Sequence, residues 1–142
     1  MSDVHNARGS CLCGAVEVIA KSISSSVGVC HCDMCRKWTG GPFMAVDGGI
    51  DVVIEGIENV SVYNSSDWAE RVFCKKCGSH LFYRLKESNQ HIIPVGIFDT
   101  DIPFILDHQI FIDSKPPYYH FGNNTKEMTG EEVFAQYAPP SE

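Results

Sequence analysis

Seven cysteines fall into three short groups whose spacing suits metal binding. The groups are Cys11 and Cys13; Cys30, Cys32 and Cys35; and Cys74 and Cys77. Cysteines at i and i+2 on an extended chain lie near the upper limit of about 7 Å between Cα atoms that a disulfide tolerates. The alternative is that the thiols are small buried hydrophobic groups. Their number and spacing favour metal ligands.

The two pairs predict a closed, structural zinc site. A glycine, Gly14 or Gly78, directly follows each pair. A chain that turns tightly round a metal often needs a positive φ at this place. Four thiolates at about 2.3 Å complete the tetrahedral coordination of Zn²⁺. We therefore expect one zinc ion to link the start of the chain to its middle and to close a loop of about sixty residues. Its ligands would be Cys11, Cys13, Cys74 and Cys77.

The group of three cysteines predicts an open, catalytic zinc site. On an extended segment Cys30 and Cys32 share one face, while His31 points to the other. Cys35 returns to the same point if the following residues form a helical turn. Three thiolates leave one position of tetrahedral zinc for another ligand, and open sites of this kind are catalytic. The alternative is that a distant histidine fills the fourth position. The candidates are His5, His80, His91, His108 and His120.

The charge of such a site predicts thiol chemistry. Zn²⁺ with three thiolates carries a formal charge of about −1, so it activates water poorly but accepts another soft, anionic ligand well. An external thiol, whose ordinary pKa is about 8.5, loses its proton near neutral pH when it binds zinc. His31 is either a proton shuttle or substrate contact, or a residue that hydrogen-bonds beside the ligands. Arg36, Lys37 and Arg71 are candidates to bind the carboxylates of the thiol substrate.

Short strands dominate the elements that must position these residues. In GAVEVIA, residues 14–20, one set of alternate residues is apolar, which is typical of a strand. Further strands are predicted at 50–56, 59–66, 70–73, 80–85, 91–98 and 108–113. Residues 129–137 predict a helix that begins with a capping box of Thr129 and Glu132. A short helical turn is expected at 33–38 and a loop at 115–121. We expect a mainly β single domain over 1–142, organised around the structural zinc.

Composition limits the classes of protein to which the chain can belong. Its 142 residues, 44% hydrophobic and 20% charged, suit one globular domain with its own core. The formal net charge of −7 argues against a broad nucleic-acid surface. The apolar runs are too short to span a bilayer, and the first ten residues contain no apolar secretory segment. We expect a cytoplasmic protein with neither nucleic-acid nor membrane partners, and the sequence does not specify its oligomeric state.

Beyond these patterns, the chain resembles the glutathione-dependent formaldehyde-activating enzyme family, which includes centromere protein V. Five motifs occur in order between about residues 8 and 119: GSCLCGAV, CHCDMCRKWTGG, YNSSDWAERVFCKKCGSHLFYR, VGIFDT and DHQIFIDSKPPYY. Tyr118 stands where such proteins often have tryptophan, a change that packing should tolerate. The resemblance implies a mainly antiparallel β fold with little helix. It also implies a structural zinc on the two cysteine pairs and a catalytic zinc on Cys30, Cys32 and Cys35.

Two functions from different classes follow. The first is a carbon–sulfur lyase, similar to S-(hydroxymethyl)glutathione synthase, that joins glutathione or a related thiol to formaldehyde or another small electrophile through a zinc-bound thiolate. Its catalytic residues would be the three cysteines and His31, with Arg36, Lys37 and Arg71 binding glutathione. The alternative is a non-catalytic zinc-binding fold that binds a partner. Two zinc ions, one of them removable by mild chelation, would favour the enzyme.

Overall fold

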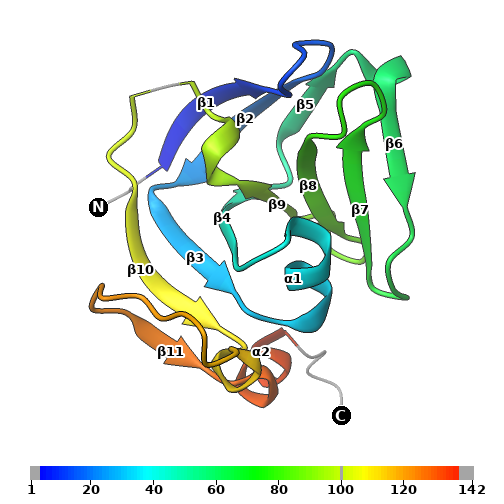
Figure 1. Cartoon of the computed structure of the whole chain (residues 1–142). Coiled ribbons are helices and arrows are strands. Elements are labelled where there is room, and N and C mark those ends of the chain that lie inside the picture. The colour runs from blue at the N-terminus through cyan, green and yellow to red at the C-terminus, as the bar shows by residue number, and fades with distance from the viewer. Residues whose placement is uncertain (1–3, 100, 138–142) are drawn as a thin grey trace. The chain divides into compact units, whose positions relative to one another are not determined.

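The chain divides into two compact units in a computed structural model that describes residues 4–99 and 101–137 (Figure 1). The first unit comprises Met1–Ser25 and Ala45–Phe104, and the second comprises Ser26–Met44 and Ile105–Glu142. Strand β4 (Phe43–Gly49) begins in the second unit and continues into the first. The single domain over 1–142 stays a prediction.

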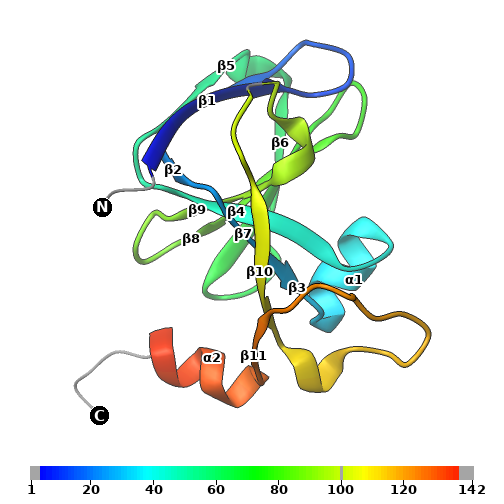
Figure 2. The same cartoon turned by 90° about the vertical axis from the view of Figure 1, so that its left-hand side faces the viewer.

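The first unit is built from two groups of antiparallel strands (Figures 1 and 2). One has the order β1–β2–β5, and the other has the order β4–β9–β8–β7–β6. The bounds are β1 Val4–Ser10, β2 Glu17–Ser24, β5 Val52–Glu55, β6 Val60–Tyr63, β7 Ala69–Cys74, β8 His80–Leu85 and β9 His91–Pro94. Two short 3-10 helices, η1 (Ile57–Asn59) and η2 (Val95–Ile97), belong to the same unit.

Burial along β2 confirms the strand that the alternating pattern predicted. Val16, Val18 and Ala20 are completely buried, whereas Glu17 and Ile19 between them are partly exposed. Successive side chains of a strand point to opposite faces, so this period of two places one face in the core.

The second unit contains a small parallel arrangement of strands. Strand β10 (Ile105–Ile110) pairs in parallel with both β3 (Ser26–Cys30) and β11 (Lys126–Met128). Helix α1 (Asp33–Thr39) follows β3, and helix α2 (Gly130–Tyr137) follows β11. Parallel neighbours need a long connection between them, and β3 and β10 lie far apart in the sequence. These parallel pairs add to the antiparallel pairing that the family resemblance implied.

Both predicted helical segments are confirmed. At α2 the amide of Thr129 donates to Glu132 Oε1 at 2.7 Å, and the amide of Glu132 donates to Thr129 Oγ1 at 3.2 Å. This is the predicted capping box, in which each side chain satisfies an amide that the helix leaves unpaired. At α1 the N-cap is Cys32 and the C-cap is Gly40, whose φ of 84° is easily adopted only by glycine.

The mainly β prediction is confirmed, although several boundaries differ. The strand predicted over 91–98 ends at Pro94 and gives way to η2, because proline has no amide hydrogen to donate. The strand predicted over 108–113 ends at Ile110, since Phe111 adopts a positive φ of 54° and a 3-10 helix, η3 (Ile112–Ser114), follows. Strands β1, β3, β4 and β11 were not predicted. Within the described part of the chain, no helix has the length and apolar character needed to cross a membrane.

Candidate metal centres

Four cysteine sulfurs of the first unit converge on one point. All four Sγ atoms, those of Cys11, Cys13, Cys74 and Cys77, lie within 4.8 Å of one another. The Sγ atoms of Cys11 and Cys13 are 3.7 Å apart, and those of Cys13 and Cys74 are 3.8 Å apart. A tetrahedron with metal–sulfur bonds of about 2.3 Å has edges of about 3.8 Å. The cluster could therefore hold a metal ion, and its spacing matches that of zinc.

Two tight turns bring these sulfurs together. The amide of Gly14 donates to the carbonyl of Cys11 at 3.1 Å, and the amide of Gly78 donates to the carbonyl of Cys74 at 2.8 Å. The φ angles of Gly14 and Gly78 are 82° and 81°, in the region that a side chain disfavours. The positive φ predicted just past each pair is confirmed at both glycines.

Hydrogen bonds to two sulfurs of the first cluster, those of Cys11 and Cys77, favour their charged form. The amide of Val16 donates to Cys11 Sγ at 3.3 Å. Ser79 accepts a hydrogen bond from the amide of Leu12 at 2.9 Å, and its hydroxyl lies 3.2 Å from Cys77 Sγ. The hydrogen bond from Ser79 lowers the pKa of Cys77 to about 5. A thiolate stabilised in this way is the form of cysteine that binds a metal.

The remaining three cysteines converge in the second unit. Cys30 ends β3, Cys32 caps α1, and Cys35 lies in the first turn of that helix. Their Sγ atoms all lie within 4.8 Å of one another, and Cys30 and Cys35 are buried. In the described part of this unit, neither His108 nor His120 joins them. This cluster could also hold a metal ion, and it offers one sulfur fewer than the first.

Crowding of the three thiols separates their pKa values. Hydrogen bonds from the thiols of Cys30 and Cys35 lower the pKa of Cys32 to about 2, and the amide of Cys35 also donates to its sulfur at 3.4 Å. The same contact with Cys32 raises the pKa of Cys30. Like charges this close disfavour one another, so ionisation of all three sulfurs requires a cation between them. The donor set therefore fits a divalent metal.

His31, between two of these cysteines, is completely buried. Its Nδ1 lies 2.8 Å from Tyr119 Oη, and its Nε2 lies 2.7 Å from Gln109 Oε1. Burial lowers the pKa of His31, which favours the neutral ring. Of the two roles considered for His31 from the sequence, the hydrogen-bonded one matches this geometry. A catalytic role stays a prediction.

The predicted cationic residues lie in different surroundings. Arg36 Nε donates to the carbonyl of His31 at 2.8 Å, and Arg36 Nη2 donates to Asp33 Oδ1 at 2.5 Å. Lys37, the next residue of α1, is exposed. Arg71 belongs to β7 of the first unit, where it is buried with its guanidinium 4.9 Å from the centre of the Tyr83 ring. Arg36 and Lys37 therefore share a unit with the cysteine triad, whereas Arg71 does not. Their binding roles stay predictions.

Three polar residues of the two clusters were not predicted from the sequence. They are Ser79, Gln109 and Tyr119. Ser79 carried a weak signal, because it directly follows the glycine of the second cysteine pair. Gln109 is the buried residue of β10, and a buried polar side chain usually has a specific partner. Tyr119 lies in the predicted loop, where the sequence indicates no partner.

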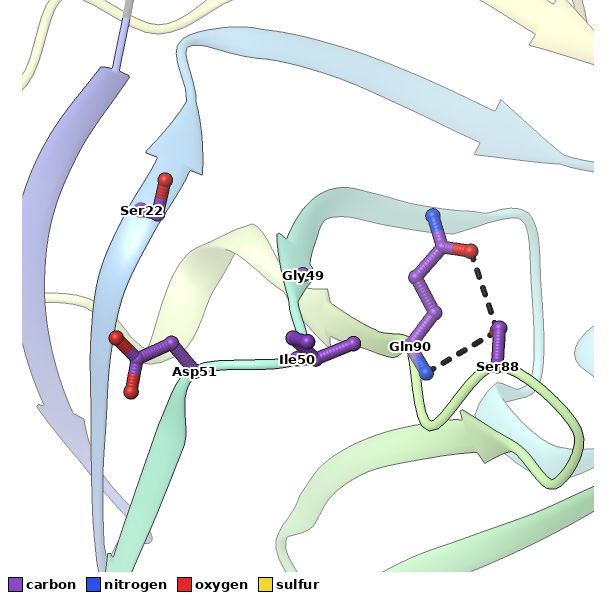
Figure 3. A pocket seen from close by; sticks show the side chains of 6 residues that line it. All are labelled: Ser22, Gly49, Ile50, Asp51, Ser88 and Gln90. Carbon is purple, nitrogen blue, oxygen red and sulfur yellow. Dashed lines mark hydrogen bonds between the residues drawn. The ribbon is translucent and has the colours of Figure 1, made fainter.

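A surface hollow of the first unit offers no comparable chemistry (Figure 3). It is lined by Ser22, Gly49, Ile50, Asp51, Ser88 and Gln90. Two hydrogen bonds of 3.3 Å join Ser88 to Gln90 at its rim. None of the predicted site residues is among these six, so the cysteine clusters remain the candidate centres.

Comparison with known proteins identifies the family. A model of the glutathione-dependent formaldehyde-activating enzyme family matches residues 6–114. The chain belongs to this family. An uncharacterised lyase of Schizosaccharomyces pombe is 37% identical over 126 residues, which cover 88% of this chain and 92% of that protein. A Halomonas elongata protein with the provisional name of a glutathione-dependent formaldehyde-activating enzyme is 29% identical, covering 78% of this chain and 77% of that protein.

The solved structure of a similar protein supports the mainly β fold of this chain. The crystal structure of a Rhodobacter sphaeroides protein matches with a TM-score of 0.58 and 25% sequence identity. The match covers 68% of this chain and 91% of that chain. The family predicted from the five motifs is therefore confirmed, together with the mainly β fold.

Proposed function

We propose that this family member is a zinc-dependent, carbon–sulfur lyase-type enzyme that joins glutathione or a related thiol to formaldehyde or another small electrophile. The observation that carries the proposal is the unequal pair of cysteine clusters, one with four converging sulfurs and one with three. Structural zinc sites are closed by four protein ligands, and catalytic sites keep one position for substrate. The names of the two curated relatives, a lyase and a glutathione-dependent formaldehyde-activating enzyme, agree with this chemistry.

The four-sulfur cluster is proposed as the structural zinc site. Two of its sulfur–sulfur distances, 3.7 and 3.8 Å, match the edge of a tetrahedral zinc site, and all four sulfurs lie within 4.8 Å of one another. The ligands come from two turns that are far apart in the sequence, so the metal would link the two chain segments of the first unit. Ser79 and the amide of Val16 would stabilise the charged sulfurs.

The three-sulfur cluster is proposed as the catalytic zinc site. When bound there, zinc would supply ionisation of the substrate thiol near neutral pH. Cys30, Cys32 and Cys35 would hold the metal, and the amide of Cys35 would keep the Cys32 sulfur oriented. His31 would maintain the shape of the loop between two ligands, since its ring nitrogens and its carbonyl all engage in hydrogen bonds.

The cationic residues are proposed to bind the carboxylates of the thiol. Lys37 is exposed and follows the triad directly, and Arg36 lies beside it on α1. Arg71 is retained as a further candidate from the first unit. Binding by Arg36 and Lys37 would position the thiolate sulfur to form a bond with the carbonyl carbon of the electrophile, whose oxygen then takes up a proton. The reverse sequence breaks the carbon–sulfur bond, which is the lyase direction.

Calorimetric titration of glutathione, with zinc counted in each sample, tests the proposal. Wild type should hold two zinc ions and bind glutathione. Cys32→Ser should hold one zinc ion, remain folded and lose glutathione binding. Wild type after mild chelation is the matched control, because it should lose the same ion and regain binding when zinc is restored. Undiminished glutathione binding by a variant that holds one zinc ion would refute the mechanism.

The same titration separates the enzyme from the alternative of a partner-binding zinc fold. A protein that holds a single zinc ion and binds no thiol would support the alternative.

A cytoplasmic location accords with seven cysteines that form no disulfide among themselves, because a reducing compartment keeps thiols available for metal.

A further inference from the structure

Strand β6 of the first unit lies at the edge of its sheet and pairs with β7 on one side (Figure 1). Among the described residues, no strand pairs with its outer side. The end of this strand is apolar and accessible, since the side chains of Val62 and Tyr63 are 55% and 65% exposed. Such an edge presents backbone donors and acceptors to which another strand can add.

The pairing with β7 decides which backbone groups of β6 point outward. The amide of Lys75 donates to the carbonyl of Asn59 at 2.8 Å, so these two residues form a hydrogen-bonded pair of the ladder. Hydrogen-bonded pairs alternate along antiparallel strands, so the next one is Ser61 with Phe73. The amide and the carbonyl of Val62 therefore point away from β7, towards the outer edge.

The other edge strands of the described sheets carry features that oppose the addition of a strand. The outer side of β1 is partly occupied, because the amide of Asp99 donates to the carbonyl of Arg8 at 3.0 Å. Strand β5 contains Glu55, and β11 contains Lys126 and Glu127. Coverage and charged side chains are common ways in which proteins protect sheet edges. Strand β6, by contrast, contains no charge and no proline, and its register with β7 is free of bulges.

We propose that two copies of this chain associate by antiparallel pairing of their β6 strands about a twofold axis at Val62. Outward-pointing backbone groups must face each other, and a register centred on Val62 meets this condition. It places Val62 opposite its own counterpart and Ser61 opposite Tyr63. Glu58, the nearest charged residue before the strand, comes opposite Ser66. No like charges therefore lie opposite each other over residues 57–67, and the edge is complementary to itself.

This self-complementary register favours a second copy as the occupant of the edge. Pairing uses the free edge of both copies, so the assembly closes at a dimer. The contact comprises one short strand with the exposed Val62 and Tyr63 side chains, which is small for a stable interface, so we expect a Kd of about 0.1 mM. Each copy carries a net charge of −7, and salt screens the resulting repulsion, so added salt should strengthen association. The inference is independent of the proposed function, because it involves neither metal nor substrate.

Sedimentation equilibrium of the zinc-loaded full chain, from about tenfold below to about tenfold above this Kd, tests the association. Wild type should pass from monomer to dimer. Val62→Lys and Val62→Glu should each stay monomeric, because like charges would lie directly opposite each other. An equimolar mixture of the two variants should regain the dimer, since opposite charges then face each other. Val53→Lys is the matched control, because Val53 lies on edge strand β5 of the same unit and is 40% exposed, and it should associate as wild type does.

Hydrogen exchange of wild type locates the contact without any substitution. In the concentrated sample the Val62 amide should exchange about fivefold more slowly than in the dilute one, since about a fifth of the chains remain monomeric at tenfold above the Kd. The Ser61 amide, which faces β7, should exchange at the same rate in both. Melting temperatures establish that each variant is folded. A monomer at every concentration would refute the proposal, as would a dimer that Val62→Lys leaves intact or a mixture of variants that stays monomeric.

Discussion

Replacement of Cys74 by serine should destabilise the whole protein rather than only inactivate it. Cys74 is completely buried, and its sulfur lies 3.8 Å from that of Cys13, which is 61 residues away in the sequence. A cross-link that closes a loop of this length removes about 4 kcal/mol of conformational entropy from the unfolded chain at room temperature. That amount is a large part of the 5–15 kcal/mol by which folded domains are typically stable. Loss of the metal ligand should therefore weaken folding substantially.

Thermal unfolding of the zinc-loaded protein measures this effect. For a chain of this size, about 4 kcal/mol corresponds to a fall of about 10–15 °C in Tm. Cys32→Ser is the matched control, since it also removes one thiol, but from a cluster whose ligands span only Cys30 to Cys35. The logarithmic dependence on loop length makes its entropic loss smaller by about 2 kcal/mol. Equal shifts in the two variants, or a wild-type Tm for Cys74→Ser, would refute the assignment of the structural site.

Two further predictions concern single side chains of the first unit. Ser79→Ala removes the hydrogen bond that lowers the pKa of Cys77, so zinc affinity measured by competition with a chelator should fall about tenfold, and an unchanged affinity would contradict this role. Burial lowers the pKa of His91, whose Nδ1 lies 2.9 Å from the carbonyl of Gly49. Between pH about 6.5 and the lower pKa of the folded state, the unfolded chain therefore binds this proton more strongly than the folded chain. The free energy of unfolding, from denaturant titrations, should be independent of His91 at higher pH and fall with acidification by at most about 1.4 kcal/mol per pH unit. His91→Asn should show a shallower fall than wild type, and identical slopes would argue against the effect.

The cysteine pairs and the triad were predictable because the cysteines within each group are close in sequence. Cys11 and Cys13 are separated by one residue and Cys74 and Cys77 by two, so local turns place each pair. The turn after each pair requires a positive φ, which glycine adopts most easily. Both glycines that follow the pairs have this conformation. Likewise, alternation around Val16 predicted which face of β2 is buried. These signals are short-range, and the sequence carries them directly.

The partners of His31 were not predictable, because they depend on pairing between distant strands. Gln109 reaches His31 across 78 residues of sequence, through the parallel register that places Gln109 opposite Val29. Apolar periodicity indicates which face of a strand is buried but not which strand lies beside it. Strand β4 was missed for a different reason, since Asp47, Gly48 and Gly49 interrupt its apolar pattern and weaken the strand signal.

The separation of 61 positions between Cys13 and Cys74 also imposes an order on biosynthesis. At about 5–20 residues per second, a ribosome needs about 3–12 s to extend the chain from the first cysteine pair to the second. During that time Cys11 and Cys13 are two thiols without their other ligands. The triad spans six residues, from Cys30 to Cys35, and its synthesis is complete within about a second. The four-sulfur cluster is thus the last to have all its ligands synthesised. A nascent chain can therefore bind metal at its three-sulfur cluster first.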